Sequence, residues 1–368
     1  MNIIRYVYFG SPFRTICTTI LVWLALWSCI PARAQSTEPR RKVTLDSSYV
    51  VDLSRRPTVR FYLSNKFNSL LVRSIGPEED LRYRPNSHYN IGVGASYRRL
   101  TLNIGVPTPF ANTDVDSKGR TRYFDAQANV YGDRQATNLF LQVYKGYHIT
   151  SHTKAQLGWV QETDFPYRSE LVQYNIGIST LRILQPERFS YRATFNQDAI
   201  QYRTQGSWLV GGYFTSYSVR GDSAIVPTRL ANGTGDALGT TKALSMDLGP
   251  MVGRAVTIVH KRSWFFTASG AAGVGPGARR FSGGLDDGGQ WRANVAWHFQ
   301  ARAGAGYNSR SWFFGAIYSQ EFIGHVGERA QGYRWDVGNL KMIAAKHLLK
   351  RPPRAVDKGV RWINNQTH

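Results

Sequence analysis

The stretch from Trp291 to Tyr307, WRANVAWHFQARAGAGY, decides the fold. Every second side chain is apolar or aromatic, which gives one face made of Trp291, Ala293, Val295, Trp297, Phe299, Ala301, Ala303, Ala305 and Tyr307. The opposite face is polar and carries Arg292, His298, Gln300 and Arg302. A period of two is that of a β-strand, whereas a helix would mix the two chemistries on one stripe. Because a strand of a soluble sheet is usually about 5–6 residues long, this longer run with aromatic ends predicts a wall that crosses a membrane.

The same alternation recurs along most of the chain, with short turns and longer loops following each other. Alternating runs occur at 59–72, 91–97, 100–106, 124–130, 139–144, 172–179, 189–195, 206–219, 244–259, 264–274, 312–322 and 333–346. Short turns are expected at 132–133, 260–263 and 309–310, and a tight turn at Gly221-Asp222 with a short strand over 223–230 keeps the number of strands even. The pattern predicts an all-β protein, a single transmembrane antiparallel β-barrel of about 14 strands, with 12 as the alternative.

The start of the chain reads as an export signal. Arg5 and Arg14 precede an apolar run over 16–30, and Pro31 and the triplet Ala32-Arg33-Ala34 follow it. The run is shorter than a membrane-spanning helix, so we expect a signal peptide over 1–34 that is cleaved after Ala34. A polar N-terminal lead-in over 35–56, the barrel over 57–347 and a basic C-terminal tail over 348–368 complete the expected organisation. Both cysteines, Cys17 and Cys29, lie in the expected signal peptide, which excludes disulfides and cysteine-ligated metals from the mature chain.

The composition is strongly basic, with 46 Lys and Arg against 24 Asp and Glu and a net charge of +22. The basic residues are scattered over turns and alternating faces, without a basic helix or a nucleic-acid-binding motif. Behind an export signal, such a balance favours the anionic headgroups of a membrane over nucleic acid. The expected partners are outer-membrane lipid, lipopolysaccharide and the barrel-assembly machinery, with small anionic solutes as a further candidate and no nucleic acid.

Several segments, taken in order, resemble one family. They are Asp46-Ser47-Ser48-Tyr49, Tyr83-Arg84-Pro85-Asn86, Ile91-Gly92-Val93-Gly94, Phe189-Ser190-Tyr191-Arg192-Ala193, Phe195-Asn196-Gln197, Gln201 and Gly206-Ser207-Trp208. Together they resemble domain of unknown function 4421 (DUF4421), a family of exported β-rich proteins regarded as outer-membrane barrels. The resemblance implies a location in the cell outer membrane and a barrel architecture. It implies no activity and no catalytic residues.

The sequence offers one weak candidate site, on the polar face of the opening stretch. Arg292, His298, Gln300 and Arg302 would point into the barrel, where paired guanidinium groups could attract an anion. The alternative, which we favour, is that they pair with acidic residues of neighbouring strands and fill the interior. No nucleophile elbow and no metal-binding spacing of histidines occurs, so we expect no catalytic site, no cofactor and no metal.

The expected function is that of an outer-membrane β-barrel of unknown specific role, either a channel or an envelope-structural protein. Two alternatives remain open, a lipid-modifying barrel enzyme and a soluble exported β-protein. The absence of a catalytic motif argues against the enzyme.

Overall fold

The computed structural model describes residues 43–73, 80–86, 89–97, 100–108, 114–230, 239–283, 289–326 and 332–348. All of them belong to one compact unit, Val43–His368. The expected signal peptide over 1–34, and the expected tail over 348–368 apart from Leu348, lie outside the described residues.

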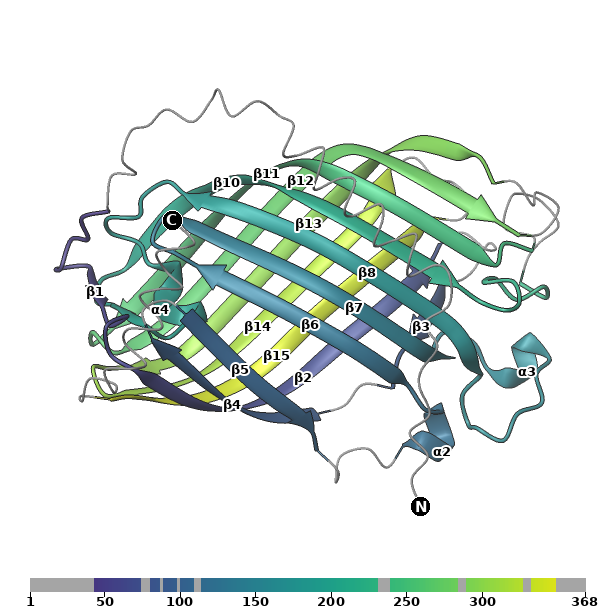
Figure 1. Cartoon of the computed structure of the whole chain (residues 1–368), viewed down its shortest axis with the longest axis horizontal. Helices are drawn as coiled ribbons and strands as arrows, with labels where there is room; N and C mark the ends of the chain where they lie inside the picture. The colour runs from purple at the N-terminus through teal and green to yellow at the C-terminus, as the bar shows by residue number, and fades with distance from the viewer. Residues whose placement is uncertain are drawn as a thin grey trace, which may run out of the picture. The chain divides into compact units, whose positions relative to one another are not determined.

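Strands dominate the structure (Figure 1). In chain order they are β1 (Val50–Asp52), β2 (Thr58–Val72), β3 (Leu81–Arg84), β4 (Tyr89–Tyr97), β5 (Leu100–Pro107), β6 (Arg122–Tyr131), β7 (Gln135–Ile149), β8 (Tyr167–Ile183), β9 (Ala199–Gln201), β10 (Gln205–Arg220), β11 (Lys242–His260), β12 (Trp264–Ser282), β13 (Trp291–Asn308), β14 (Trp312–Val326) and β15 (Tyr333–His347). Three short helices are α2 (Val115–Lys118), α3 (Lys154–Leu157) and α4 (Tyr191–Phe195). None of the helices in the described ranges is long and apolar enough to span a membrane.

The strands form a closed antiparallel barrel. Within the described residues its ring has ten strands, in the order β2, β15, β14, β13, β12, β11, β10, β8, β7 and β3, and β3 pairs back to β2. Three further strands extend this sheet, since β4 pairs with β2, β5 with β4 and β6 with β7. The predicted all-β antiparallel barrel is confirmed. The predicted count of 14 or 12 strands is not, because the sheet has 13 strands of which ten close the ring.

The expected strand over 189–195 is wrong, because this segment is the helix α4 and its flanks. We call residues 189–201 the plug, since every one of them is buried. An alternating sequence indicates a strand only when its two faces meet different surroundings. Here Arg192 and Thr194 are buried as deeply as Tyr191 and Ala193, because they find polar partners inside the barrel.

The expected tight turn at Gly221-Asp222 and the strand over 223–230 are also wrong. Residues 221–230, which we call the cap, form no strand, and Ile225 and Val226 are buried in succession. Two adjacent apolar side chains cannot share one face of a strand, so the segment folds over the barrel instead. Arg168 fixes it by donating hydrogen bonds to the carbonyl oxygens of Ser223, at 3.0 Å, and Ala224, at 2.7 Å.

The opening stretch forms β13, and its alternation places polar side chains inside. Ala296, His298, Gln300 and Arg302 are buried, whereas Val295 and Phe299 are exposed on the outside. The other strands follow the same arrangement. Exposed outward residues include Val59, Phe61, Leu63, Leu139, Leu141, Val210, Leu248, Val252, Val274 and Phe314. Buried inward residues include Arg60, Ser64, Asn68, Asn138, Gln142, Asn175, Ser179, Thr215 and Asp247.

Side chains fill the interior toward both ends. We call the end with the short connections 132–134, 261–263 and 309–311 the turn end, and the opposite end the loop end. The plug enters at the turn end, where α4 lies inside the ring (Figure 1). At the loop end, Ile225 and Val226 of the cap join a buried cluster with Tyr83, Tyr147 and Trp335. The barrel is therefore not an open tube along its axis.

Candidate functional site

The four sequence candidates lie on β13, but the structure brings only three of them together. His298, Gln300 and Arg302 are 1%, 2% and 6% exposed and point inward. Arg292 is exposed near the loop end of the strand. The candidate site is therefore a buried polar layer rather than a ring of free cations.

Glu321 of β14 is the centre of this layer. Its carboxylate lies 3.2 Å from Nε2 of His298, accepts a hydrogen bond of 2.6 Å from Gln300, and lies 3.6 Å from Nη2 of Arg302. The register of the β13–β14 pair puts Glu321 directly opposite Gln300. The negative charge that balances the layer thus comes from a neighbouring strand. The Glu321 carboxylate contacts the same side chains that an anionic solute would bind.

Arg302 also connects the layer to the plug. Its Nη1 donates a 2.5 Å hydrogen bond to the hydroxyl of Tyr131, and its guanidinium lies 5.7 Å from the centre of that ring. The Tyr131 ring packs 5.5 Å from Tyr191 of α4, whose hydroxyl donates to Ser269 at 3.1 Å. The wall and the plug are therefore one continuous polar and aromatic network.

The contacts of Glu321 predict that Glu321→Gln lowers the stability of the barrel. The amide oxygen of the variant can still accept a hydrogen bond, but the amide nitrogen turns its own donors toward His298 or Arg302, and the balancing negative charge is lost. We expect a loss of about 1–3 kcal/mol in the free energy of unfolding, the usual result of leaving a buried polar group unsatisfied. Urea-dependent unfolding in vesicles measures it. Glu187→Gln, at an exposed position before the plug, should change stability little, and an equal loss in both variants would contradict the role of the layer.

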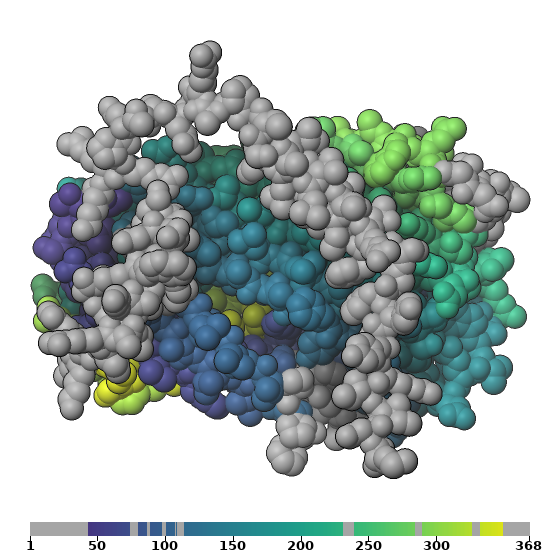
Figure 2. Space-filling model, viewed as in Figure 1, coloured from purple at the N-terminus to yellow at the C-terminus, as the bar shows by residue number. Residues whose placement is uncertain are grey.

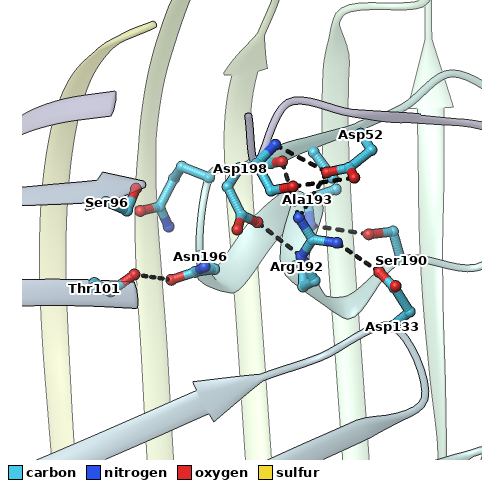
Figure 3. A network of polar contacts seen from close by, with 12 residues as sticks. Asp52, Ser96, Thr101, Asp133, Ser190, Arg192, Ala193, Asn196 and Asp198 are labelled. Atoms are coloured by element: carbon cyan, nitrogen blue, oxygen red, sulfur yellow. Dashed lines mark hydrogen bonds and ion pairs between the residues drawn. The ribbon is translucent and has the colours of Figure 1, made fainter. Parts of the chain in front are cut away.

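The plug is held by a second cluster, centred on Arg192 (Figure 3). The Arg192 side chain is 1% exposed and contacts three carboxylates. Its Nη2 lies 2.8 Å from Asp52, its Nη1 2.5 Å from Asp133 and its Nε 3.0 Å from Asp198. These carboxylates come from β1, from the β6–β7 turn and from the plug itself. One guanidinium therefore ties the plug to two other parts of the chain.

The charges of this cluster support one another. Burial by itself lowers the pKa of Arg192, but Asp198 and Asp52 outweigh burial and raise it above its usual range. Burial raises the pKa of Asp198, and Arg192 opposes that rise only in part. For Asp52 burial acts in the same direction, but Arg192 and the Ser54 amide hold its pKa below the usual value. Arg192 is thus charged at every physiological pH, and the plug depends on that charge.

A third cluster, which sequence reasoning missed, combines Ser245, Asp247 and His325. Ser245 Oγ lies 3.1 Å from Nε2 of His325, and the Asp247 carboxylate lies 3.1 Å from the same nitrogen. The Tyr217 hydroxyl is 3.4 Å from Nδ1. In a catalytic triad the nucleophile and the acid contact opposite ring nitrogens, whereas here they share one. The sequence does show that Ser245 and Asp247 lie on the same face of one strand. It does not show that His325 is near them, because β12 and β13 separate β11 from β14 in the sheet.

Within the residues that the structure describes, no group of three or more His, Cys, Asp or Glu side chains could hold a metal ion. The polar side chains of the interior form pairs and small clusters.

Comparison with solved structures finds several chains similar to this one at low identity. The outer membrane protease OmpT from Escherichia coli matches with 8% identity over 81% of this chain and 98% of its own, at a TM-score of 0.28. A FadL homologue from Pseudomonas aeruginosa matches with 9% identity over 79% of this chain and 90% of its own, at a TM-score of 0.25. An outer membrane channel from Pseudomonas putida F1 matches with 7% identity over 83% of this chain and 100% of its own, at a TM-score of 0.24.

No curated protein matches the sequence. One family does, the family described as Domain of unknown function (DUF4421), which matches residues 44–331. The match covers most of the 368 residues and includes the first fourteen of the fifteen strands, β1 to β14. The chain therefore belongs to the DUF4421 family, as its motifs suggested.

Proposed function

We propose that the mature chain is an outer-membrane β-barrel whose axial route is closed by its own residues. The observation that carries the proposal is the distribution of side chains across the wall. Large apolar residues are exposed on the outside, and arginines, carboxylates and amides are buried on the inside. A barrel in water would gain nothing from such an arrangement, whereas a barrel in lipid requires it.

Aromatic residues near the short turns support a membrane interface at the turn end. Trp264 packs 5.5 Å from Tyr307 beside the 261–263 turn, and Trp312 packs 5.5 Å from Phe314 beside the 309–311 turn. Trp and Tyr gather at the two membrane interfaces, where an apolar ring and a polar edge are both solvated. We propose that the short turns face the periplasm, as is usual for single-chain barrels.

The two ends of the interior favour a binding or envelope-structural role over an open channel for polar solutes. The plug fills the turn end and the cap covers part of the loop end. The groups that could have bound an anion, His298 and Arg302, already contact Glu321. The proposed partners remain outer-membrane lipid, lipopolysaccharide and the barrel-assembly machinery.

Envelope fractionation of the chain expressed with its own leader tests this proposal. We expect the protein in the outer-membrane fraction, resistant to carbonate and urea extraction, and migrating faster on gels before heating than after it. Recovery as a monomer in the soluble periplasmic fraction without detergent would contradict it and favour the soluble β-protein.

A lipid-modifying enzyme is the second candidate, because Ser245, His325 and Asp247 lie together in the interior. If this cluster were catalytic, Ser245→Ala would abolish phospholipid hydrolysis or acyl transfer by the reconstituted protein. We expect instead that neither the wild type nor Ser245→Ala has such activity, since all three groups are buried and the two oxygens share one nitrogen. A turnover that Ser245→Ala removes would favour the enzyme.

A further inference from the structure

The barrel wall has two strand edges without a partner strand among the described residues. β5 pairs only with β4, and β6 pairs only with β7. The ring closes beside them through β3, which contacts β7 at only two pairs, Tyr83 with Ile149 and Arg84 with His148, at the loop end. At the turn end, Thr101 of β5 donates a 3.0 Å hydrogen bond to Asn196 of the plug. Between these two attachments β5 and β6 face each other without ladder hydrogen bonds.

The side chains of both edge strands, β5 and β6, alternate between outward apolar and inward polar residues, as in the rest of the wall. Leu102, Ile104 and Val106 on β5 point outward and are 60–65% exposed, and Phe124 and Val130 on β6 are 58% exposed. The residues between them, Asn103 on β5 and Gln127 and Asn129 on β6, point inward and are exposed too. Elsewhere in the wall inward amides such as Asn138 and Gln142 are buried.

The space-filling view agrees with these exposures. Figure 2 shows atoms in the yellow of β15, on the far wall, through an opening between the blue strands of the near wall. The break between β5 and β6 is therefore an opening from the outside of the barrel into its interior.

Such an opening is costly in a lipid environment if nothing fills it. Unpaired backbone N–H and C=O groups cannot find hydrogen-bond partners in hydrocarbon, so open sheet edges do not face lipid. Water or a bound molecule with polar groups must satisfy them.

Basic side chains lie directly behind the opening. Lys66 of β2 reaches across to Asp125 of β6, with Nζ 2.9 Å from the carboxylate. Lys341 of β15 lies with Nζ 5.1 Å from the centre of the Tyr62 ring, and that ring rests on Gly92 and Gly105 of β4 and β5, where a Cβ would overlap it. The Tyr62 contact places Lys341 next to the inner side of β5.

The charges of this group do not balance. Arg60, beside Tyr62, donates to Ser96 at 2.7 Å and to the carbonyl oxygen of Asn196 at 3.1 Å, and both acceptors are neutral. In the described part of the chain, Asp125 is the only carboxylate within ion-pair distance of Lys66, and neither Arg60 nor Lys341 has one. Among the described residues, Asp125 is thus the single carboxylate in an ion pair with these three cations, and Asp198 acts on Arg60 only from a longer distance. The remaining positive charge attracts an anion.

We propose that the opening between β5 and β6 binds an anionic amphiphile from the membrane. Its carboxylate or phosphate head lies inside near Lys66 and Lys341, and its apolar chain passes between the outward residues of β5 and β6 into lipid. The alternation of both edges matches such a molecule, because their inner side is polar and their outer side is apolar. A strand from a second copy would satisfy the edges but would leave the cations unbalanced. The inference rests on the proposed membrane location.

Photo-crosslinking tests the proposal with the full mature protein in phosphatidylcholine vesicles. The probes are a fatty acid, a phosphatidic acid and a phosphatidylcholine, each with a diazirine in its tail, and mass spectrometry maps the labelled peptides. We expect both anionic probes to label the peptides of β5 and β6 about tenfold more than the zwitterionic probe does, as for a charge-assisted contact. A preference for one anionic head would identify the source of the ligand.

Two lysines of β15 provide a matched pair of variants. Lys341→Met removes the cation at the opening and should reduce labelling by the anionic probes about tenfold, and Lys341→Arg should restore it. Lys346→Met removes a lysine that lies 3.9 Å from the Trp312 ring near the turn end and should leave labelling unchanged. Heat-modifiable migration of each variant verifies that the barrel is folded.

Four results would overturn the inference. They are labelling spread evenly around the barrel, equal labelling by all three probes, equal effects of Lys341→Met and Lys346→Met, and a crosslinked dimer through β5 and β6. Displacement of the probes by inorganic phosphate alone would also contradict the need for an apolar chain. If the protein resists carbonate extraction but shows one of these results, only the inference fails; if it does not resist, the proposed membrane location fails first.

Discussion

Replacing Arg192 with leucine is expected to release the plug from the turn end while the wall stays assembled. The substitution leaves Asp198, which is 1% exposed, without its guanidinium, and it also removes the partner of Asp52 and Asp133. Removing one member of a buried ion pair usually costs about 3–5 kcal/mol, because the remaining charge stays desolvated. The hydrogen bonds of the wall do not involve Arg192, so the loss should fall on the plug.

Limited proteolysis of the reconstituted protein measures this release. In the wild type the plug, residues 189–201, is buried and should resist cleavage, whereas in Arg192→Leu it should be cut rapidly. Planar-bilayer recordings should show a larger conductance for the variant, because the plug no longer fills the turn end. Arg188→Leu is the matched control. Arg188 is 60% exposed and lies 3.5 Å from Asp46, and surface pairs of this kind contribute about 0–1 kcal/mol.

Identical protection of the plug in Arg192→Leu and Arg188→Leu would show that the three carboxylates do not depend on Arg192. The double variant Arg192→Leu/Asp198→Asn separates the loss of contacts from the cost of the buried charge. It should recover part of the lost stability, since the amide is far easier to bury than the carboxylate.

An arginine at Val252 is expected to destabilise the barrel strongly. Val252 lies in the middle of β11, points outward and is 56% exposed. In water such a residue would accept arginine with little effect. Facing lipid at the bilayer midplane, the same change costs about 2–4 kcal/mol.

Val160→Arg is the control for this prediction. Val160 is 101% exposed and lies between α3 and β8, outside the strands of the wall. Urea-dependent unfolding in vesicles should show a large loss for Val252→Arg and none for Val160→Arg. Two equally harmless substitutions would mean that water, not lipid, surrounds the wall.

The wall could be predicted from the sequence because its two environments are opposite. Outside and inside impose apolar and polar side chains alternately, so a run such as 291–307 carries its own signal. The partner of the β13 candidates does not follow from the sequence in the same way. A two-residue turn at 309–310 would place Ser319 opposite Gln300, whereas the observed pairing of Asn308 with Phe313 places Glu321 there.

The plug and the remaining clusters could not be predicted in this way. Residues 189–195 alternate like a strand, yet they are buried on all sides, so the pattern carried no information about two faces. Asp247 and His325 meet across the interior, and Lys66 and Asp125 meet across the opening. Both contacts depend on the closure of the barrel, which no local pattern encodes. The interruption between β3 and β4, where β2 changes partner, likewise has no periodic signal.

Spin-label accessibility along β13 tests the central claim, a barrel wall with lipid outside and a packed polar interior, most directly. Each residue from Ala293 to Ala305 is replaced in turn by a spin-labelled cysteine in the reconstituted protein, and collisions with oxygen and with a water-soluble nickel complex are measured. We predict high oxygen accessibility at Val295, Ala301, Ala303 and Ala305, and low accessibility to both reagents at Ala296, Gln300 and Gly304. Equal accessibility at neighbouring residues, or outward positions open to the nickel complex, would contradict a membrane-spanning barrel.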